Sequence, residues 1–383
     1  MMSKKSPQLR FEGFTDDWEE RKLNENVENI GTGRSSFKAG LDYSEQTPYE
    51  VLGSTSVISY SDSFDHSGNF VLTARVGANA GNLYKHSGNL KISDNTVYIQ
   101  SKNLEFIFYL LTKYDLKKLA FGTGQPLIKA SELKNLKLFF PKKFGEQQKI
   151  GSFFKQLDET IALHQRKLDL LKEQKKGYLQ KMFPKNGAKV PELRFAGFAD
   201  DWEQRKLNEV SDIYDGTHQT PKYQDDGVMF LSVENIKTLT SNKFISREAF
   251  EDEFKIRPQR GDVLMTRIGD IGTANVVETD EDLAYYVSLA LFKSEELNPY
   301  FLQASIYAPS VQDQIWKRTL HIAFPKKINK NEIGQVPINV PTLAEQTKIG
   351  SFFKQLDDTI ALIQRKLDLL KEQKKGFLQK MFV

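Results

Sequence analysis

Apolar residues recur at alternating intervals of four and three positions through residues 146–183. This is the heptad spacing of a coiled-coil seam. No proline interrupts the stretch, so it predicts one continuous helix about 55 Å long at a rise of 1.5 Å per residue. The predicted seam contains Phe154, Leu157, Ile161, His164, Leu168 and Leu171, continued by Lys175.

A nearly identical stretch follows at residues 345–382, where 34 of 38 aligned positions are the same. Thr342 and Glu345 predict a capping box at its start. Because a lone helix cannot bury a single apolar stripe, we expect the two helices to pack together, although each could instead lie on its own domain. Lys175 and Lys374 at matching positions either fix the register or extend from frayed ends to solvent. The second seam is Phe353, Leu356, Ile360, Ile363, Leu367 and Leu370.

A second motif is also duplicated, reading PQLRFEGFTDDWEERKL from Pro7 and PELRFAGFADDWEQRKL from Pro191. We call each copy a tag. The repeats predict an ordered series of segments with a pseudo-two-fold relation between the halves. These are a first variable domain at 1–141 with its tag at 7–23, a long helix at 142–183, a linker at 184–192, a second variable domain at 193–341 with its tag at 193–207, and a long helix at 342–383.

The two variable domains share an order of features but little identity. Alternating stretches at 70–77 and 262–269 predict strands that end in glycine, and 95–101 and 285–293 predict further strands. Helices are predicted at 104–119 and at 299–308, the latter with Asn298 as its cap. The sequence therefore predicts an α+β fold with two homologous domains whose loops have diverged.

Composition narrows the possible functions. The 383 residues include no cysteine, which excludes disulfides and thiolate metal sites. No signal peptide or membrane-spanning run is evident, so we expect a cytoplasmic protein with no membrane partner. Nucleotide-loop, hydrolase and metal motifs are absent, and Asn298-Pro299-Tyr300 lacks the second proline of adenine methyltransferases. We therefore expect no catalytic residue, no metal site and no cofactor bound by this chain.

Polar loops are the remaining candidates for function. The net charge of +4 permits a nucleic-acid partner, and cationic, amide and hydroxyl donors on glycine-containing loops suit phosphates and base edges. Arg75 and Arg267 occupy equivalent positions, with a strand-end ion pair as the alternative interpretation. The candidate DNA-binding residues are Arg75, Asn79, Asn82, Lys85, Thr123, Gln125, Lys129, Thr217, His218, Thr220, Lys222, Tyr223, Arg267, Asp270, Thr273, Arg318, His321, Lys326 and Lys327.

The tags, the GTHQTPKY loop, the GDVLMTRIGDIG stretch, the GTGQP loop and the EQxKIGSFFKQLD helix starts together resemble the DNA-specificity subunit of type I restriction-modification systems. The resemblance implies a non-catalytic subunit with two target recognition domains held apart by antiparallel helices. Each domain would bind one half of a split target in double-stranded DNA. Two methyltransferase subunits would bring S-adenosylmethionine, and two restriction subunits would bring motor activity, ATP and Mg²⁺.

The helix length agrees with this expectation, since about 55 Å corresponds to about 16 base pairs of 3.4 Å each. Three alternatives remain open at this point. The chain could be a stand-alone bipartite DNA-binding regulator, an enzyme that modifies or cleaves DNA itself, or a coiled-coil scaffold without nucleic acid. Only the last predicts no salt-dependent affinity for DNA.

Overall fold

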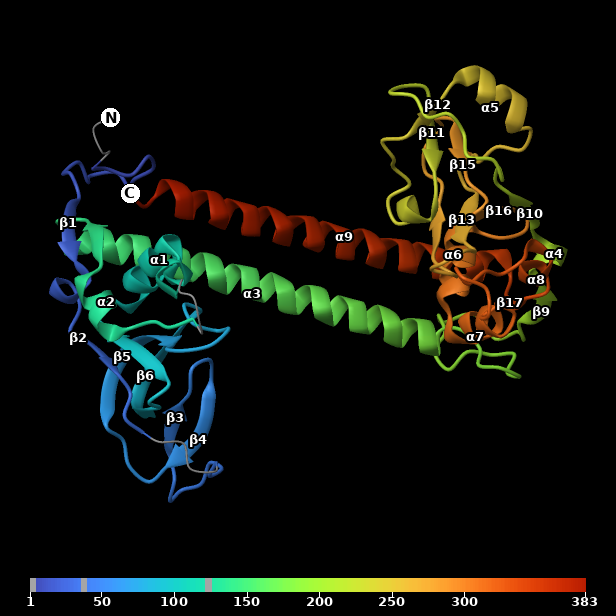
Figure 1. Cartoon of the computed structure of the whole chain (residues 1–383). Coiled ribbons are helices and arrows are strands. Elements are labelled where there is room, and N and C mark those ends of the chain that lie inside the picture. Colours follow the sequence, from blue (N-terminus) through green and yellow to red (C-terminus); the bar gives the residue numbers. More distant parts are fainter. Residues whose placement is uncertain (1–4, 36–39, 121–125) are drawn as a thin grey trace. The chain divides into compact units, whose positions relative to one another are not determined.

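The computed structural model describes residues 5–35, 40–120 and 126–383. The chain divides into two compact units, of which unit 1 contains Met1–Gln165 and Arg365–Val383 and unit 2 contains Arg166–Gln364. Because this division falls inside both long helices, α3 (Phe144–Lys181) and α9 (Leu343–Lys380), each unit includes part of each helix (Figure 1).

Unit 1 combines a curled sheet with two short helices. Over the described residues its main sheet has the strand order β2-β7-β5-β6-β3-β4, and a separate ribbon pairs β1 with β8. The elements are β1 (Glu19–Lys22), β2 (Asn29–Thr32), β3 (Tyr49–Leu52), β4 (Val57–Ser61), β5 (His66–Ala74), β6 (Leu83–Ile92), β7 (Thr96–Gln100), α1 (Leu104–Tyr114), α2 (Ala130–Asn135) and β8 (Lys137–Phe140), with 3-10 turns at Leu23–Glu25 and Leu116–Ala120.

Unit 2 repeats part of this plan with strand order β10-β16-β13-β14, a separate sheet β12-β11-β15 and a ribbon that pairs β9 with β17. The elements are β9 (Glu203–Lys206), α4 (Leu207–Val210), β10 (Asp212–Asp215), β11 (Val228–Leu231), β12 (Phe244–Ile245), α5 (Arg247–Glu253), β13 (Val263–Thr266), β14 (Ala274–Val276), β15 (Leu283–Tyr285), β16 (Leu289–Lys293), α6 (Pro299–Tyr307), α7 (Pro309–Lys317), α8 (Lys330–Gly334) and β17 (Pro337–Val340), with a 3-10 turn at Val233–Asn235. Mixed helix and strand content on a duplicated plan confirms the predicted α+β class.

Within each unit, the parts of α3 and α9 run antiparallel. In unit 1, Phe153 contacts Phe377 at 5.1 Å between ring centroids, and Lys374 lies 2.5 Å from a carboxylate oxygen of Asp158. In unit 2, Tyr178 contacts Phe352 at 4.9 Å, and Lys175 lies 2.5 Å from Asp357. Both seam lysines are therefore paired with the facing helix rather than frayed.

The heptad positions of both helices lie on their less exposed side. Phe154, Leu168, Phe353, Ile363 and Leu367 are buried, whereas Leu157, Ile161, His164, Leu171, Leu356, Ile360 and Leu370 are half-buried. Four leucines outside the heptad pattern are exposed, namely Leu163, Leu170, Leu362 and Leu369, whereas Leu179 and Leu378 near the helix ends pack against the unit cores. The sorting of leucines by heptad position is what a single apolar seam requires.

A buried ion pair connects each tag to the start of a long helix. Arg10 donates two hydrogen bonds to Glu146, at 2.6 and 2.8 Å, and Glu146 is almost fully buried. Arg194 makes the equivalent pair with Glu345, with both distances 2.7 Å. These bidentate bonds compensate the desolvation of the carboxylate, which explains why both tag and helix start occur twice.

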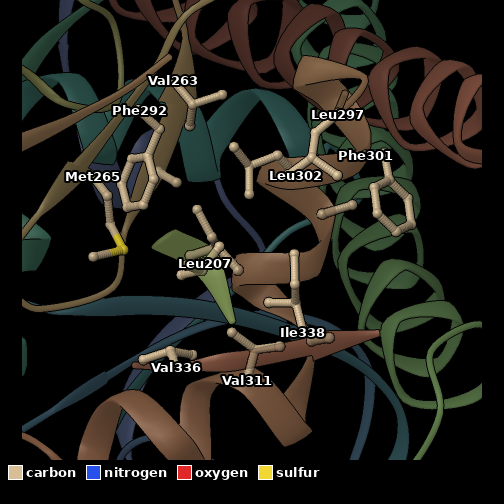
Figure 2. Close-up of a cluster of buried hydrophobic side chains, with 14 of the residues drawn as sticks. Leu207, Val263, Met265, Phe292, Leu297, Phe301, Leu302, Val311, Val336 and Ile338 are labelled. Atoms are coloured by element: carbon tan, nitrogen blue, oxygen red, sulfur yellow. The ribbon is translucent and has the colours of Figure 1, made fainter. Parts of the chain in front are cut away.

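The core of unit 2 forms where the sheet, α4, α6 and α7 meet. Figure 2 shows Leu207, Met265, Phe292, Leu302 and Ile338 drawn together from elements far apart in the sequence. Phe183, just beyond the end of α3, adds its ring to this core at 6.0 Å from Trp202. In unit 1, Phe382 beyond the end of α9 lies 6.2 Å from Trp18. Apolar burial of this kind is the main stabilising contribution to such a unit.

Several predicted elements have different bounds. Compared with the apolar stretches at 146–183 and 345–382, the long helices begin and end about two residues earlier. They end earlier because Met182, Phe183, Met381 and Phe382 pack into the unit cores instead of continuing the helices. The predicted strand at 285–293 is wrong as one element, because β15 and β16 belong to different sheets.

The predicted helix 104–119 ends at Tyr114, where Asp115 adopts a left-handed conformation with φ of 64°. The Asn298 cap is confirmed, since its side chain accepts hydrogen bonds from the backbone of Tyr300 and Phe301. The capping box is only half formed. Thr342 accepts from the backbone of Glu345, but the Glu345 side chain binds Arg194 instead.

Candidate nucleic-acid interface

The two units contain an equivalent strand core that positions the candidate loops. Val71 of β5 pairs with Ile99 of β7, which pairs with Ile30 of β2. In unit 2, Val263 of β13 pairs with Phe292 of β16, which pairs with Ile213 of β10. This register places Arg75 and Arg267 at the same point, one residue beyond the ends of β5 and β13.

Backbone hydrogen bonds hold the residues after each arginine in the same way. In unit 1, the amide of Gly77 donates to Pro126 at 3.0 Å, and the amide of Ile128 donates to the carbonyl of Arg75 at 2.7 Å. In unit 2, Gly269 donates to Lys326 at 2.8 Å, and Ile328 donates to Arg267 at 2.9 Å. Both turn glycines have positive φ, 86° for Gly77 and 81° for Gly269, a conformation that favours glycine.

Arg267 is buried, with 7% of its surface exposed. Its guanidinium forms an ion pair with Asp215 at the end of β10 and donates from Nε to the carbonyl of Ile328 at 3.2 Å. Tyr285 donates its hydroxyl to the backbone oxygen of Asp215 at 3.2 Å, and burial raises the pKa of Tyr285. This arrangement matches the ion-pair interpretation. In this structure the arginine joins three loop segments and does not offer its guanidinium to a ligand.

Arg75 is exposed, and its side chain has no hydrogen bond or ion pair among the described residues. The register explains the contrast, because Thr32 lies where Asp215 lies in unit 2. Without a carboxylate beside it, Arg75 remains available to an anionic partner. The equivalence of the two arginines was predictable from the sequence, whereas the difference between their partners was not.

The other candidates in unit 1 differ in availability. Asn79 is exposed and accepts a bond from Asn82 at 3.2 Å. Lys85 is paired with Glu105, and its Nζ atom lies 5.0 Å from the centre of the Phe108 ring. Both partners belong to α1, so the ammonium group already has contacts within the unit. Lys129 is exposed beside Glu132 at 3.3 Å. Thr123 and Gln125 lie outside the described residues.

In unit 2, the loop after β10 lines an open groove of about 560 Å³. Thr217 and His218 line this groove with Lys255 and Lys330, which brings hydroxyl, imidazole and ammonium donors together. Further along the loop, Thr220 and Lys222 are exposed. Tyr223 is also exposed, and Lys243 lies 5.4 Å from the centre of its ring.

Two further loops lie beside the loop after β10. Arg267 at the start of the first pairs with Asp215, and Gly269 in that loop donates a hydrogen bond to Lys326 in the second. In the turn between β13 and β14, Asp270 is exposed and accepts a bond from the hydroxyl of Thr273 at 3.0 Å. After α7, Arg318 is half-buried and bound to Gln314 at 2.7 Å, whereas His321, Lys326 and Lys327 are exposed.

Sequence reasoning missed three exposed apolar residues, one near the end of α7 and two in the loop after it. Trp316 is more than half exposed, and the side chains of Ile322 and Phe324 are fully exposed. Large apolar residues among cations were the available signal, since Lys317, Arg318, Lys326 and Lys327 surround them. The interpretation considered only polar side chains as DNA contacts and therefore overlooked them.

Neither a metal site nor a membrane span is found in the part of the chain that the structure describes. No group of three histidine, aspartate or glutamate side chains there is arranged to hold a metal ion. No helix there combines the length and apolar character needed to cross a bilayer.

A family model described as the type I restriction modification DNA specificity domain matches residues 15–173 and 199–372. The chain belongs to this family. Specificity subunits are the non-catalytic components of restriction-modification complexes, and this one contains two DNA-recognition domains. The family assignment confirms the predicted resemblance.

Individual relatives agree with the family assignment. The type I restriction enzyme MjaVIII specificity subunit of Methanocaldococcus jannaschii is 24% identical over 333 residues, which cover 81% of this chain and 77% of the relative. The crystal structure of a type I S subunit from M. genitalium matches with a TM-score of 0.71 at 16% identity and covers 99% of both chains. A structure from a study of complex assembly in a type I R-M system matches with a TM-score of 0.52 at 18% identity, covering 96% of this chain and 98% of the other.

Proposed function

We propose that this specificity subunit recognises a split target in double-stranded DNA, with one half-site bound by the loops of each unit. The observation that carries the proposal is the repeated strand-end turn, which is held by the same backbone bonds in both units but bears different side chains. A fixed frame with different loops is suited to reading two different half-sites. Phosphate contacts would position each unit, and base-edge contacts would supply specificity.

The long helices would set the gap between the half-sites. Each contains 38 residues and is therefore about 57 Å long at 1.5 Å per residue. This length corresponds to about 17 base pairs at 3.4 Å each, which accommodates two short half-sites separated by about one turn of DNA. The ion pairs Lys374–Asp158 and Lys175–Asp357 support a fixed helix register within each unit.

Catalysis would reside on partner subunits. Two methyltransferase subunits would bring S-adenosylmethionine, and two restriction subunits would bring ATP and Mg²⁺, in the cytoplasm. Support comes from the family of the chain and from the similarity to a structure from a study of complex assembly in a type I R-M system. Exposed cations on α3, including Lys155, Arg166 and Lys172, are available for docking these partners.

The test is to sequence, with methylation-sensitive long reads, the genome of cells that express the partner methyltransferase with and without this chain. We expect methylated adenine in one split motif only when the chain is present. Replacing residues 24–141 with the corresponding segment of another specificity subunit should change one half of that motif and leave the other half intact. A change in both halves would contradict the modular mechanism.

A stand-alone DNA-binding regulator is the alternative that this experiment separates. If no motif is methylated although the methyltransferase is active with its own control subunit, the partner-dependent proposal fails. Selection of bound sequences with the pure chain would then identify a target that the regulator reads without a partner.

A further inference from the structure

The loop after α7 presents two large apolar side chains to solvent. Ile322 and Phe324 have relative exposures of 100% and 104%, so neither packs against the rest of unit 2. Leu320 beside them is also exposed, at 40%. These three residues lie within five positions of the chain, and clustered exposed apolar side chains mark an interaction site more often than isolated ones do.

Cations flank this apolar tip in the sequence. Residues 316–327 contain Lys317, Arg318, Lys326 and Lys327 and no acidic residue. The Trp316 ring contacts two side chains of this segment. The Nζ atom of Lys326 lies 4.9 Å from the ring centre, and the centre of the His321 ring lies 4.1 Å from it. Lys326 and Lys327 therefore place exposed positive charge close in sequence to the apolar side chains, as suits a polyanionic partner.

The base of the loop is anchored beside the recognition turn of unit 2. Lys326 accepts the hydrogen bond from Gly269 at 2.8 Å, and the amide of Leu320 donates to Lys327 at 2.8 Å. A held base with a free apolar tip can present Ile322 and Phe324 to a ligand that already contacts the turn.

The first half of the chain offers a natural contrast in sequence. Aligning Ile128 with Ile328, which make equivalent backbone bonds, places Gly122 and Gly124 opposite Ile322 and Phe324. The first half therefore has no large apolar side chain at either position, so a wedge would be specific to unit 2.

We propose that Ile322 and Phe324 form an apolar wedge that enters a base step of the DNA bound by unit 2. Apolar side chains flanked by cations unstack base steps in this way in proteins that kink DNA. Lys326 and Lys327 would bind the flanking phosphates, and a flexible pyrimidine–purine step would be preferred. The inference rests on the proposed function, because it requires that unit 2 bind a half-site.

Double-stranded DNA is favoured over a protein partner by two observations. Lys326 and Lys327 beside the tip are exposed and have no acidic partner among the described residues, whereas Lys317 is paired with Asp313 at 2.6 Å. The base of the tip is hydrogen-bonded to the turn that carries other candidate DNA contacts. Protein interfaces are depleted of lysine in their cores. Docking of a partner subunit at the tip is the competing outcome of the test.

The test uses the chain in complex with its methyltransferase, without methyl donor. The DNA duplexes contain the motif that the methylation experiment identifies as the target. 2-Aminopurine is placed in turn at each step of the half-site that changes when residues 208–341 are exchanged. Wild type is compared with I322S/F324S, with the apolar replacement I322L/F324L, and with L41S, which removes an exposed leucine of unit 1.

We expect enhanced 2-aminopurine fluorescence at one step other than the methylated adenine. The enhancement should persist in I322L/F324L and L41S and disappear in I322S/F324S, together with a loss of affinity of about tenfold or more for the motif. Unchanged fluorescence and affinity in I322S/F324S would overturn the wedge.

Two other outcomes are distinguishable. If I322S/F324S loses the methyltransferase in size-exclusion chromatography, the tip docks a protein and the wedge is wrong. If the wild-type complex does not prefer the motif to random duplex, the proposed function fails before any variant is compared, and the wedge fails with it.

Discussion

Unit 1 and unit 2 keep the same frame but present different chemistry at equivalent positions. The strand core, the strand-end turn and the buried pair between tag and helix occur in both units. At the end of the first strand, however, Thr32 in unit 1 corresponds to Asp215 in unit 2. Arg75 is exposed with no side-chain partner among the described residues, whereas Arg267 is buried in an ion pair. The same residue in the same turn is therefore a surface cation in one unit and an internal support in the other.

The repeated residues fall into two groups, those buried in the core and those in the surface turns. Glu146 and Glu345 are buried and bound twice, so a change at either position would leave an arginine without its partner. The side chains of the turns either lie at the surface or contact a single neighbouring side chain. They can therefore be substituted without a change in core packing. Repetition in this chain marks residues that hold the frame, whereas divergence marks residues available for recognition.

The largest expected effect concerns the frame. Glu146→Ala leaves Arg10 largely buried without its carboxylate, and we expect it to lower the free energy of unfolding of unit 1 by about 3 kcal/mol. Glu345→Ala is the matched variant in unit 2. Its loss should be slightly smaller, because Trp18 also donates to Glu146 at 3.4 Å, whereas the indole of Trp202 has no partner among the described residues.

Hydrogen exchange resolved by segment measures both variants, because it reports the opening of each unit separately. Glu146→Ala should raise exchange first in β8 and α1, and Glu345→Ala in β17 and α6. Unchanged protection in both variants would show that the buried pairs do not hold the frame.

The next effect concerns the two arginines. Arg75→Ala should weaken binding to the methylated motif by about tenfold, the loss expected for one direct contact worth about 1–3 kcal/mol, and should leave folding unchanged. Arg267→Ala should instead lower the stability of unit 2, because it leaves Asp215 without its partner. Binding titrations and thermal unfolding of both variants test the contrast.

Exchange of the neighbouring residue sharpens this comparison. Thr32→Asp places a carboxylate beside Arg75 and should reduce DNA affinity nearly as much as Arg75→Ala. Lys102→Ala is the control, because Lys102 is an exposed cation outside the candidate loops. Equal losses in Lys102→Ala and Arg75→Ala would indicate general electrostatic attraction instead of a specific contact.

The heptad pattern and the tags were sufficient to predict the class, the duplication and the helix pairing. They rest on short-range periodicity and on identity between copies, which need no knowledge of contacts. The partners of Arg267 were not predictable, because Asp215 lies 52 residues away and meets it only through the strand register. The end of the helix predicted at 104–119 was missed because the chain turns at Asp115, which adopts a left-handed conformation. No proline or glycine next to Asp115 indicates this turn in the sequence.

A smaller effect is expected at the helix seam. Asp158 pairs with Lys374 and accepts a hydrogen bond from Tyr109 at 2.6 Å, whereas Tyr307 in unit 2 donates to Ala274 instead of to Asp357. Asp158→Asn should therefore cost more stability than Asp357→Asn, by about 1 kcal/mol in these partly exposed pairs. Urea unfolding of both variants measures this difference, and equal losses would show that the tyrosine bond adds nothing.

The same tyrosine gives the pair a pH signature. Burial and the bond to Asp158 raise the pKa of Tyr109 above its ordinary value of about 10. A raised pKa in the folded state means that this contribution is complete below about pH 10 and is lost as the pH rises further. Tyr109→Phe should flatten that alkaline loss of stability.

The smallest effect concerns the seam position at which one helix copy has His164 and the other has Ile363. His164 is half-buried, and its Nδ1 atom is buried without a hydrogen-bond partner, whereas Ile363 at the matching position of α9 is buried and apolar. His164→Leu removes the unpaired polar atom and keeps an apolar side chain in the seam, so it should stabilise the chain by about 1 kcal/mol and raise the melting temperature by about 2–4 °C. Ile363→His should destabilise by at least as much, because it introduces a polar ring at a more buried position. Calorimetry of both variants decides the matter: a melting temperature that stays unchanged or falls in His164→Leu would mean that the histidine is satisfied by solvent and does not belong to the seam.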